Sequence, residues 1–159
     1  MLGAAHGMPW LGIIVVPLVL AVHFALSPNR KAEVILVLTA GAMGFCVDTF
    51  LVKAGVFTPV LYLFPFPLSP PWMVLLWMDF ATALNVSLKK LHGRYLLSAV
   101  LGGIGGPSAY YSGAKLGATT LIPGTADLLV LSVAWAAAVP ALFWIAERIN
   151  EKYKRAEVH

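Results

Sequence analysis

Charged residues are scarce in this sequence: they make up 11% of its 159 residues, whereas 60% are apolar. An ordinary soluble domain carries roughly a quarter charged residues. The composition therefore excludes a globular protein with a water-covered surface. A membrane-spanning helix uses about 20 apolar residues, so a chain of this length also has no room for a large domain outside a membrane.

Cysteines and catalytic motifs are lacking as well. The single cysteine, Cys46, excludes an intrachain disulfide and a zinc site built from cysteines. The sequence contains no GxSxG, HExxH or phosphate-loop motif. The histidines are scattered along the chain, so we predict no metal site, no cofactor and no catalytic residues; they are His6, His23, His92 and His159.

Long apolar runs are what the sequence does have. Because a lipid environment requires every backbone polar group to be satisfied internally, such runs span a bilayer as helices. We predict an all-α polytopic membrane protein, a bundle of five transmembrane helices that forms one domain over residues 1–159. The predicted spans are 8–26, 33–52, 72–88, 95–114 and 126–145.

Two segments do not fit a spanning helix. Segment 53–71 contains five prolines and several aromatic residues, and aromatic rings prefer the membrane interface. We predict an interfacial loop there. The basic segment 146–159 is expected to continue the last helix into water, with Glu151 and Arg155 at the favourable i, i+4 spacing.

Basic residues define an orientation, because cytoplasmic loops carry the excess of lysine and arginine. One side of the five-helix topology has only Lys53 and Lys115. The sequence therefore predicts a cytoplasmic C-terminus and an outside N-terminus, with the lipid bilayer rather than nucleic acid as the partner of these charges. The other side holds Arg30, Lys31, Lys89, Lys90, Arg94, Arg148, Lys152, Lys154 and Arg155.

Three ionisable residues fall inside predicted spans, where such groups are costly and mark a function or a structural lock. They are His23, Asp48 and Asp79. The two aspartates belong to the same outer half of the membrane and could share one polar cavity. The alternative is structural: Asp48 could pair with Lys53 or Lys115, Asp79 could be satisfied by a hydroxyl or a carbonyl, and His23 could cap helix carbonyls.

Two helix faces carry further patterns. On the third predicted helix, Asp79, Thr82, Asn85 and Lys89 fall within a narrow stripe, which indicates either a buried polar network or polar contacts between helices. On the fourth predicted helix, small residues recur every four positions, a spacing that lets another helix approach closely. These small residues are Ser98, Gly102 and Gly106.

Several stretches resemble a bacterial inner-membrane family designated domain of unknown function 2878. They are residues 2–12 (LGAAHGMPWLG), His23 near the end of the first helix, residues 80–88 (FATALNVSL) and residues 105–118 (GGPSAYYSGAKLGA). The resemblance covers almost the whole chain, and its last stretch is the most specific. It implies a small polytopic protein of the inner membrane with no established activity.

The chain departs from the family pattern at two places. Family members usually have one more apolar helix before residues 2–12, which would make six spans and move the N-terminus inside. Position 79 is usually apolar or small in the family, which weakens Asp79 as a shared functional residue. The resemblance favours Asn85, Ser87, Ser108 and Tyr110 as site residues instead.

The sequence supports three functional hypotheses. The first is a non-catalytic accessory or binding component of the inner membrane, linked to lipid metabolism, with a membrane enzyme or a second copy of the chain as partner. The second is a small transporter or proton-coupled carrier that uses Asp48 and Asp79 and works as an oligomer. The third, an intramembrane enzyme, has the least support because no catalytic motif is present.

Overall fold

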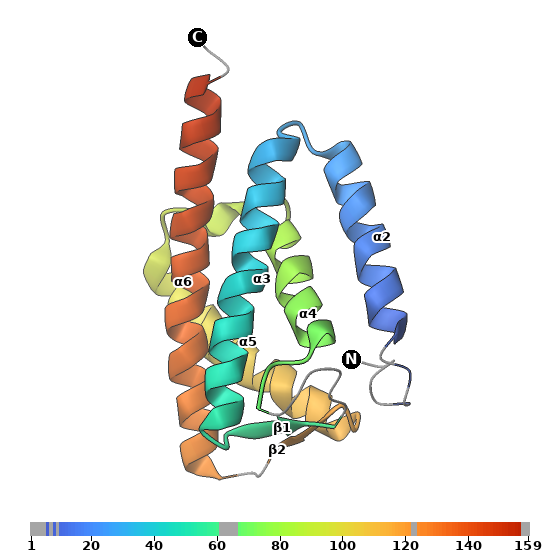
Figure 1. Ribbon diagram of the computed structural model, residues 1–159. Helices are drawn as coiled ribbons and strands as arrows, with labels where there is room; N and C mark the ends of the chain where they lie inside the picture. The colour runs from blue at the N-terminus through green and yellow to red at the C-terminus, as the bar shows by residue number, and fades with distance from the viewer. Residues whose placement is uncertain (1–5, 7, 9, 61–66, 122–123, 157–159) are drawn as a thin grey trace.

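The computed structural model describes residues 6, 8, 10–60, 67–121 and 124–156 (Figure 1). Within these residues the fold is all-α, apart from a ribbon of two short strands. The predicted loop positions 61–66, the last three residues of the predicted tail, and residues 2–5, 7 and 9 of the first family stretch lie outside the described residues. The elements are α2 (Trp10–Leu26), α3 (Arg30–Lys53), β1 (Phe57–Pro59), α4 (Pro71–Leu84), the 3-10 helix η1 (Lys89–Leu91), α5 (Tyr95–Lys115), β2 (Thr119–Leu121) and α6 (Thr125–Ala156).

Helix α3 lies at the centre of the bundle, between α4 and α6 (Figure 1). Helix α5 crosses behind α3 and packs along α6, while α2 lies at the periphery against α4 and α3. The link between α2 and α3, the η1 turn and the C-terminal part of α6 lie toward one end of the bundle, and the β-ribbon closes the other end. This arrangement places most basic residues at the end opposite the ribbon.

Helix α3 begins three residues earlier than the sequence predicted. Asn29 is its N-cap, and the Asn29 side chain accepts a hydrogen bond of 3.1 Å from the backbone N–H of Ala32. Such a cap satisfies one of the free N–H groups of a first helical turn. The helix consequently includes Arg30 and Lys31, and it brings Glu33 into its first turn.

Glycines end α3 and α5 in the same way and lead both into the ribbon. Gly55 and Gly117 have φ angles of 76° and 80°, which an L-residue with a side chain rarely adopts. At each end the residue after the glycine donates to a carbonyl five positions earlier, Val56 to Leu51 and Ala118 to Gly113, as in a Schellman motif.

The ribbon corrects the prediction that segment 53–71 is only a loop. β1 pairs antiparallel with β2, with Thr58 opposite Thr120. Strands of three residues have no readable hydrophobic alternation, so the sequence alone does not reveal them. The ribbon ties the connection after α3 to the connection after α5.

Helix α4 is shorter than the predicted span 72–88. It ends at Leu84, and Asn85 is its C-cap. Asn85, Val86 and Ser87 all have modest helix propensity, and the backbone N–H of Leu88 turns back to bond the carbonyl of Ala83 at 2.8 Å. The predicted stripe therefore breaks up, because Lys89 lies in η1 and not on the same helix as Asp79.

Helix α6 is the longest element, with 32 residues. At 1.5 Å per residue it is about 48 Å long, which exceeds a hydrocarbon core of about 30 Å. The helix thus continues through the basic segment, as the sequence predicted. In that segment Arg148 pairs with Glu151 at 3.7 Å, whereas the expected partner of Glu151, the side chain of Arg155, is outside the described part.

Glycines allow the closest helix contacts. A Cβ on Gly106 would lie 2.1 Å from Cγ of Trp135, and a Cβ on Gly44 would lie 2.0 Å from Cγ of Trp77. Gly102 is also too close to its neighbour for a side chain, with the carbonyl oxygen of Trp135 at 2.6 Å from the Cβ position. The small-residue face of α5 therefore packs against α6 of the same chain, and the indole rings occupy the space that side chains would fill.

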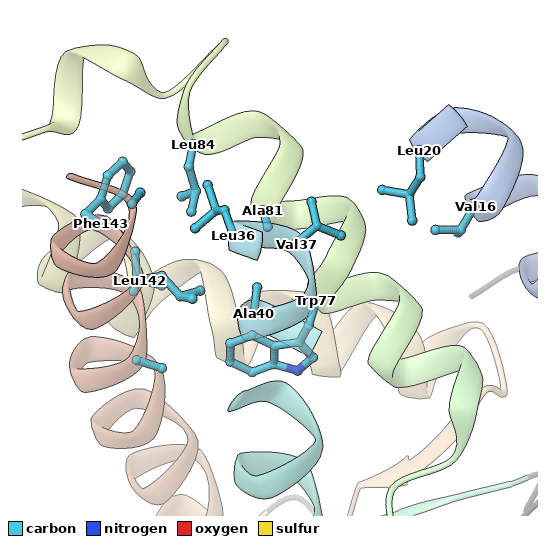
Figure 2. Close-up of a cluster of buried hydrophobic side chains, with 13 residues drawn as sticks. Val16, Leu20, Leu36, Val37, Ala40, Trp77, Ala81, Leu84, Leu142 and Phe143 are labelled. Atoms are coloured by element: carbon cyan, nitrogen blue, oxygen red, sulfur yellow. The ribbon is translucent and has the colours of Figure 1, made fainter. Parts of the chain in front are cut away.

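The buried core has two parts. The first lies between α3, α4 and α6, where Leu36, Ala40, Trp77 and Leu142 meet (Figure 2). The second lies near the ribbon and includes Phe57, Trp72, Tyr110 and Leu131.

Large apolar side chains also cover the outside of the bundle. Leu18 on α2, Ile104 on α5 and Val133 on α6 are each more than 60% exposed. Monomeric soluble proteins rarely expose contiguous apolar surface of this extent. Among the described residues, two helices are long and apolar enough to span a membrane, Arg30–Lys53 and Ala126–Lys154, and the apolar helices Leu11–Leu26 and Pro71–Leu84 are shorter.

Adjacent glycines on α5 allow a matched test of the helix contact. We expect Gly106→Ala to destabilise the fold by about 1–3 kcal/mol, because the added methyl group overlaps Trp135. Gly105→Ala should be neutral or stabilising by up to about 1 kcal/mol, because nothing lies within 4 Å of its Cβ position. Thermal unfolding of both variants in the same detergent measures the difference, and equal midpoints would show that α5 and α6 do not pack in this way.

Candidate functional site

Asp48 is the most deeply buried ionisable residue among those described, with an exposed fraction of 0%. The indole Nε1–H of Trp77 donates to its Oδ2 at 2.9 Å, and the hydroxyl of Tyr110 donates to its Oδ1. These two hydrogen bonds connect α3 with α4 and α5. The alternative of an ion pair with Lys53 or Lys115 is not observed among the described residues, where the partners of Asp48 are these two neutral donors.

The surrounding sequence explains how these donors reach Asp48. Gly44 lies one helical turn before Asp48 on α3, so the Trp77 ring can lie directly on the helix backbone. Gly106 lies one turn before Tyr110 on α5 and accepts the Trp135 ring in the same manner. The two indoles stack with their centroids 4.4 Å apart.

A cavity of about 470 Å³ extends from Asp48 between α4 and α5, with α6 as its floor. Its wall is almost entirely apolar and aromatic, and small-molecule sites typically combine such a wall with a few placed polar groups. Asp48, Tyr110 and Thr119 supply polar groups at the ribbon end, and the indoles of three tryptophans line the wall. The lining also includes Met73, Leu76, Phe80, Leu88, Leu91, Leu101, Gly102, Gly105, Ala109, Val139 and Phe143.

The cavity is partly open. Helix α4 packs mainly on α2 and α3, whereas α5 packs mainly on α6, and direct contact between α4 and α5 is sparse. Leu76 and Phe80 from α4 and Leu101 and Gly105 from α5 line the cavity, and Leu101 is 48% exposed. We therefore place the opening between α4 and α5, where apolar side chains and a glycine border it.

A second polar cluster lies at the other end of the bundle. Glu33 on α3 contacts Nε2 of His23 at 3.0 Å and accepts a hydrogen bond of 2.8 Å from Asn85. Asn85 in turn accepts from Asn150 on α6 at 2.9 Å. These contacts connect α2, α3, the end of α4 and α6. Glu33 is only 7% exposed, and the neighbouring side chains supply the partners that a buried carboxylate needs, so its role is structural.

The sequence prediction named His23 and Asn85 but missed Glu33 and Asn150. A readable signal existed for Glu33: in an antiparallel helix pair, His23 near the end of one helix lies opposite the first turn of the next. Glu33 was instead taken as the boundary of an apolar run. No comparable signal identified Asn150, because it lies on a polar segment far along the chain.

A third cluster attaches the start of α5 to α6. Glu147 accepts hydrogen bonds from the backbone N–H of Gly93 at 2.6 Å and from the hydroxyl of Tyr95. Nδ1 of His92 lies 3.3 Å from the same carboxylate. This cluster fixes the η1 corner beside the cavity.

The remaining predicted residues lie away from the cavity. Asp79 is two residues from Trp77, or about 200° around the helix, and it is absent from the cavity lining in the described part of the chain. Of the two alternatives for the aspartates, a shared cavity is therefore not what the described residues form. Thr82 and Ser108 donate to backbone carbonyls of their own helices at 2.7 Å, and Ser87 is exposed.

The described residues also contain no group of three or more histidine, cysteine, aspartate or glutamate side chains arranged to hold a metal ion. The polar atoms at the cavity are a carboxylate, hydroxyls and indole N–H groups. This set suits hydrogen bonding to a bound molecule.

The buried Asp48 contacts can be tested with an apolar variant that has the same branching at Cγ. Asp48→Leu leaves two buried donors without an acceptor, and each orphaned group costs about 1–3 kcal/mol. We expect a large fall in the midpoint of thermal unfolding, whereas Asp79→Leu should change it little. Adding Tyr110→Phe to Asp48→Leu should recover stability, because it removes one orphaned donor; a further loss would contradict the hydrogen-bonding geometry.

Comparison with known proteins gives one match. The profile of the family described as Protein of unknown function (DUF2878) matches residues 1–141. Neither the curated proteins nor the solved structures include a match to this chain. The match covers all of the helices that line the cavity up to Ala141 on α6, and thus nearly all of the cavity wall. The chain belongs to the DUF2878 family.

Proposed function

We propose that this protein is a non-catalytic binding component of the bacterial inner membrane, and that it takes a small, largely apolar molecule from the bilayer into the cavity beside Asp48. The lateral opening between α4 and α5 carries this proposal. An opening bordered by Leu76, Phe80 and Leu101 would be unfavourable in water, whereas in a bilayer it faces hydrocarbon.

The distribution of apolar surface supports a membrane location. Apolar side chains cover the outer faces of α2, α3, α5 and α6, with Leu38 and Phe50 on α3 being 58% and 67% exposed. In a lipid bilayer such apolar faces contact hydrocarbon chains directly and do not have to be buried against other protein. Helix α5 is 21 residues long, enough to cross a bilayer, although its glycines lower its mean hydropathy.

The charges support the orientation predicted from the sequence. Most basic residues lie near the end of the bundle opposite the ribbon, on the α2–α3 link, the η1 corner and the C-terminal part of α6. Lys53 and Lys115 lie at the ribbon end. With the positive end inside, the C-terminus is cytoplasmic and the ribbon faces outward.

The cavity favours binding over transport. A proton-coupled carrier that uses both aspartates requires Asp48 and Asp79 on one pathway, yet Asp79 lies on another face of α4. A molecule held here could be presented to a membrane enzyme of lipid metabolism, which is the accessory role that we propose.

Cysteine labelling tests the orientation. The native thiol is first removed as Cys46→Ser, and Lys115→Cys and Lys90→Cys are then made separately. An impermeant maleimide should label Lys115→Cys in intact cells, whereas Lys90→Cys should react only after permeabilisation. Labelling in detergent controls for accessibility, and the reverse pattern in cells would overturn the orientation.

Tryptophan quenching tests the binding proposal, because Trp72, Trp77 and Trp135 line the cavity. In nanodiscs, 1-bromododecane should quench the fluorescence with a saturable component. Gly105→Phe should remove that component by filling the opening, whereas Ile104→Phe, at a position that is 64% exposed on the outer face, should retain it. Quenching that stays linear with probe concentration in the unmodified protein would refute the proposed function.

A further inference from the structure

We infer that the bound molecule is a single-chain apolar alcohol, oriented with its hydroxyl between Asp48 and Thr119 and its chain toward Leu88 and Leu91. This inference rests on the proposed function and specifies the chemical class and orientation of the ligand. It follows from three features of the cavity: an unused buried hydroxyl, spare acceptor capacity on a carboxylate, and a lining that is otherwise almost entirely apolar.

The unused hydroxyl belongs to Thr119, which lines the cavity and is only 6% exposed. Its Oγ1 is buried and makes no hydrogen bond within the described part of the protein. A buried polar atom without a partner costs about 1–3 kcal/mol, and most such atoms in native proteins have one. A ligand group at this end of the cavity would supply the missing partner.

Asp48 can accept more than it does in the fold. A carboxylate offers about four lone-pair positions, and Trp77 and Tyr110 use one on each oxygen. The remaining positions can accept a hydrogen bond from a donor in the cavity. Thr119 at the same end can both donate and accept, so the pair matches a group that also does both.

A hydroxyl group fits this description better than a charged group. A second anion beside the Asp48 carboxylate would be repelled, and in an apolar cavity the repulsion is weakly screened. A cation would lose its hydration shell on entering, and apart from the polar groups at this end the lining offers only aromatic and aliphatic side chains in return. A neutral hydroxyl can donate to Asp48 and accept from Thr119 with no net charge to bury.

The far end of the cavity suits a hydrocarbon chain. The lining follows α5 from Gly113 to Leu101, a distance of about 18 Å at 1.5 Å per residue. Beyond Tyr110 toward the η1 corner, it continues through Val139, Phe143 and Leu88. An elongated molecule with one polar end therefore fits the cavity better than a compact polar molecule does.

Competition against 1-bromododecane tests the inference in nanodiscs, with concentrations expressed as mole fractions in the bilayer. We expect 1-dodecanol to displace the probe at about fivefold lower mole fraction than dodecane, as one or two net hydrogen bonds allow. Thr119→Val should abolish this preference while dodecane still competes. Thr120→Val, at the exposed neighbouring position of the strand, should keep it.

The outcomes separate the inference from the proposed function. If neither dodecane nor 1-dodecanol displaces the probe from the unmodified protein, the proposed function fails. If both displace it equally and Thr119→Val changes nothing, the inference fails while apolar binding stands. Stronger competition by dodecanoate than by 1-dodecanol at alkaline pH would also overturn the inference, because it would show that the cavity prefers an anion.

Discussion

The buried carboxylate of Asp48 is the group on which the arrangement of α3, α4 and α5 depends. In an apolar interior it must be satisfied by the fold, and the donors that satisfy it come from two other helices, Trp77 on α4 and Tyr110 on α5. Trp77 reaches it across Gly44, where a side chain would overlap the indole ring, and one turn before Tyr110 the glycine Gly106 admits the ring of Trp135. Hydrogen bonding to Asp48 and close packing of the helices therefore depend on each other at this point.

The same constraint creates the cavity. Trp77 of α4 and Trp135 of α6 stack on each other, and the two rings lie against Gly44 of α3 and Gly106 of α5, so the stack separates α3 from α5 by two indole rings. Below this stack the ribbon closes the space with Thr119, and above it the η1 corner, attached to α6 through Glu147, closes the other end. Because glycines on α5 face the gap, no side chain from that helix fills it. The cavity is therefore a consequence of the helix contacts and not a defect in them.

Much of the fold follows from the sequence, because long apolar runs and basic clusters are strong signals. The predicted bounds of the five helices agree with the structure to within a few residues except at the end of α4. There the apolar run continues through residues of modest helix propensity, so hydropathy alone does not show where the helix ends. Asp48 was identified because an ionisable residue within an apolar run is conspicuous. Its donor Trp77 was not, since a tryptophan in such a run is typical of lipid-facing surface as well. The cavity depends on how α5 crosses the bundle, and that angle has no local sequence signal.

The two clusters of buried acids make different demands on the protein. Glu33 contacts His23 and accepts a hydrogen bond from Asn85, and through Asn85 it is connected to Asn150. Asp48 borders a cavity of about 470 Å³ with an unpaired threonine hydroxyl at the same end. Burial does not separate the two carboxylates, because Asp48 is 0% exposed and Glu33 is 7% exposed. What distinguishes Asp48 is the cavity that it lines together with a threonine hydroxyl that lacks a partner among the described residues, and these neighbours make Asp48, rather than Glu33, the group that a ligand would meet.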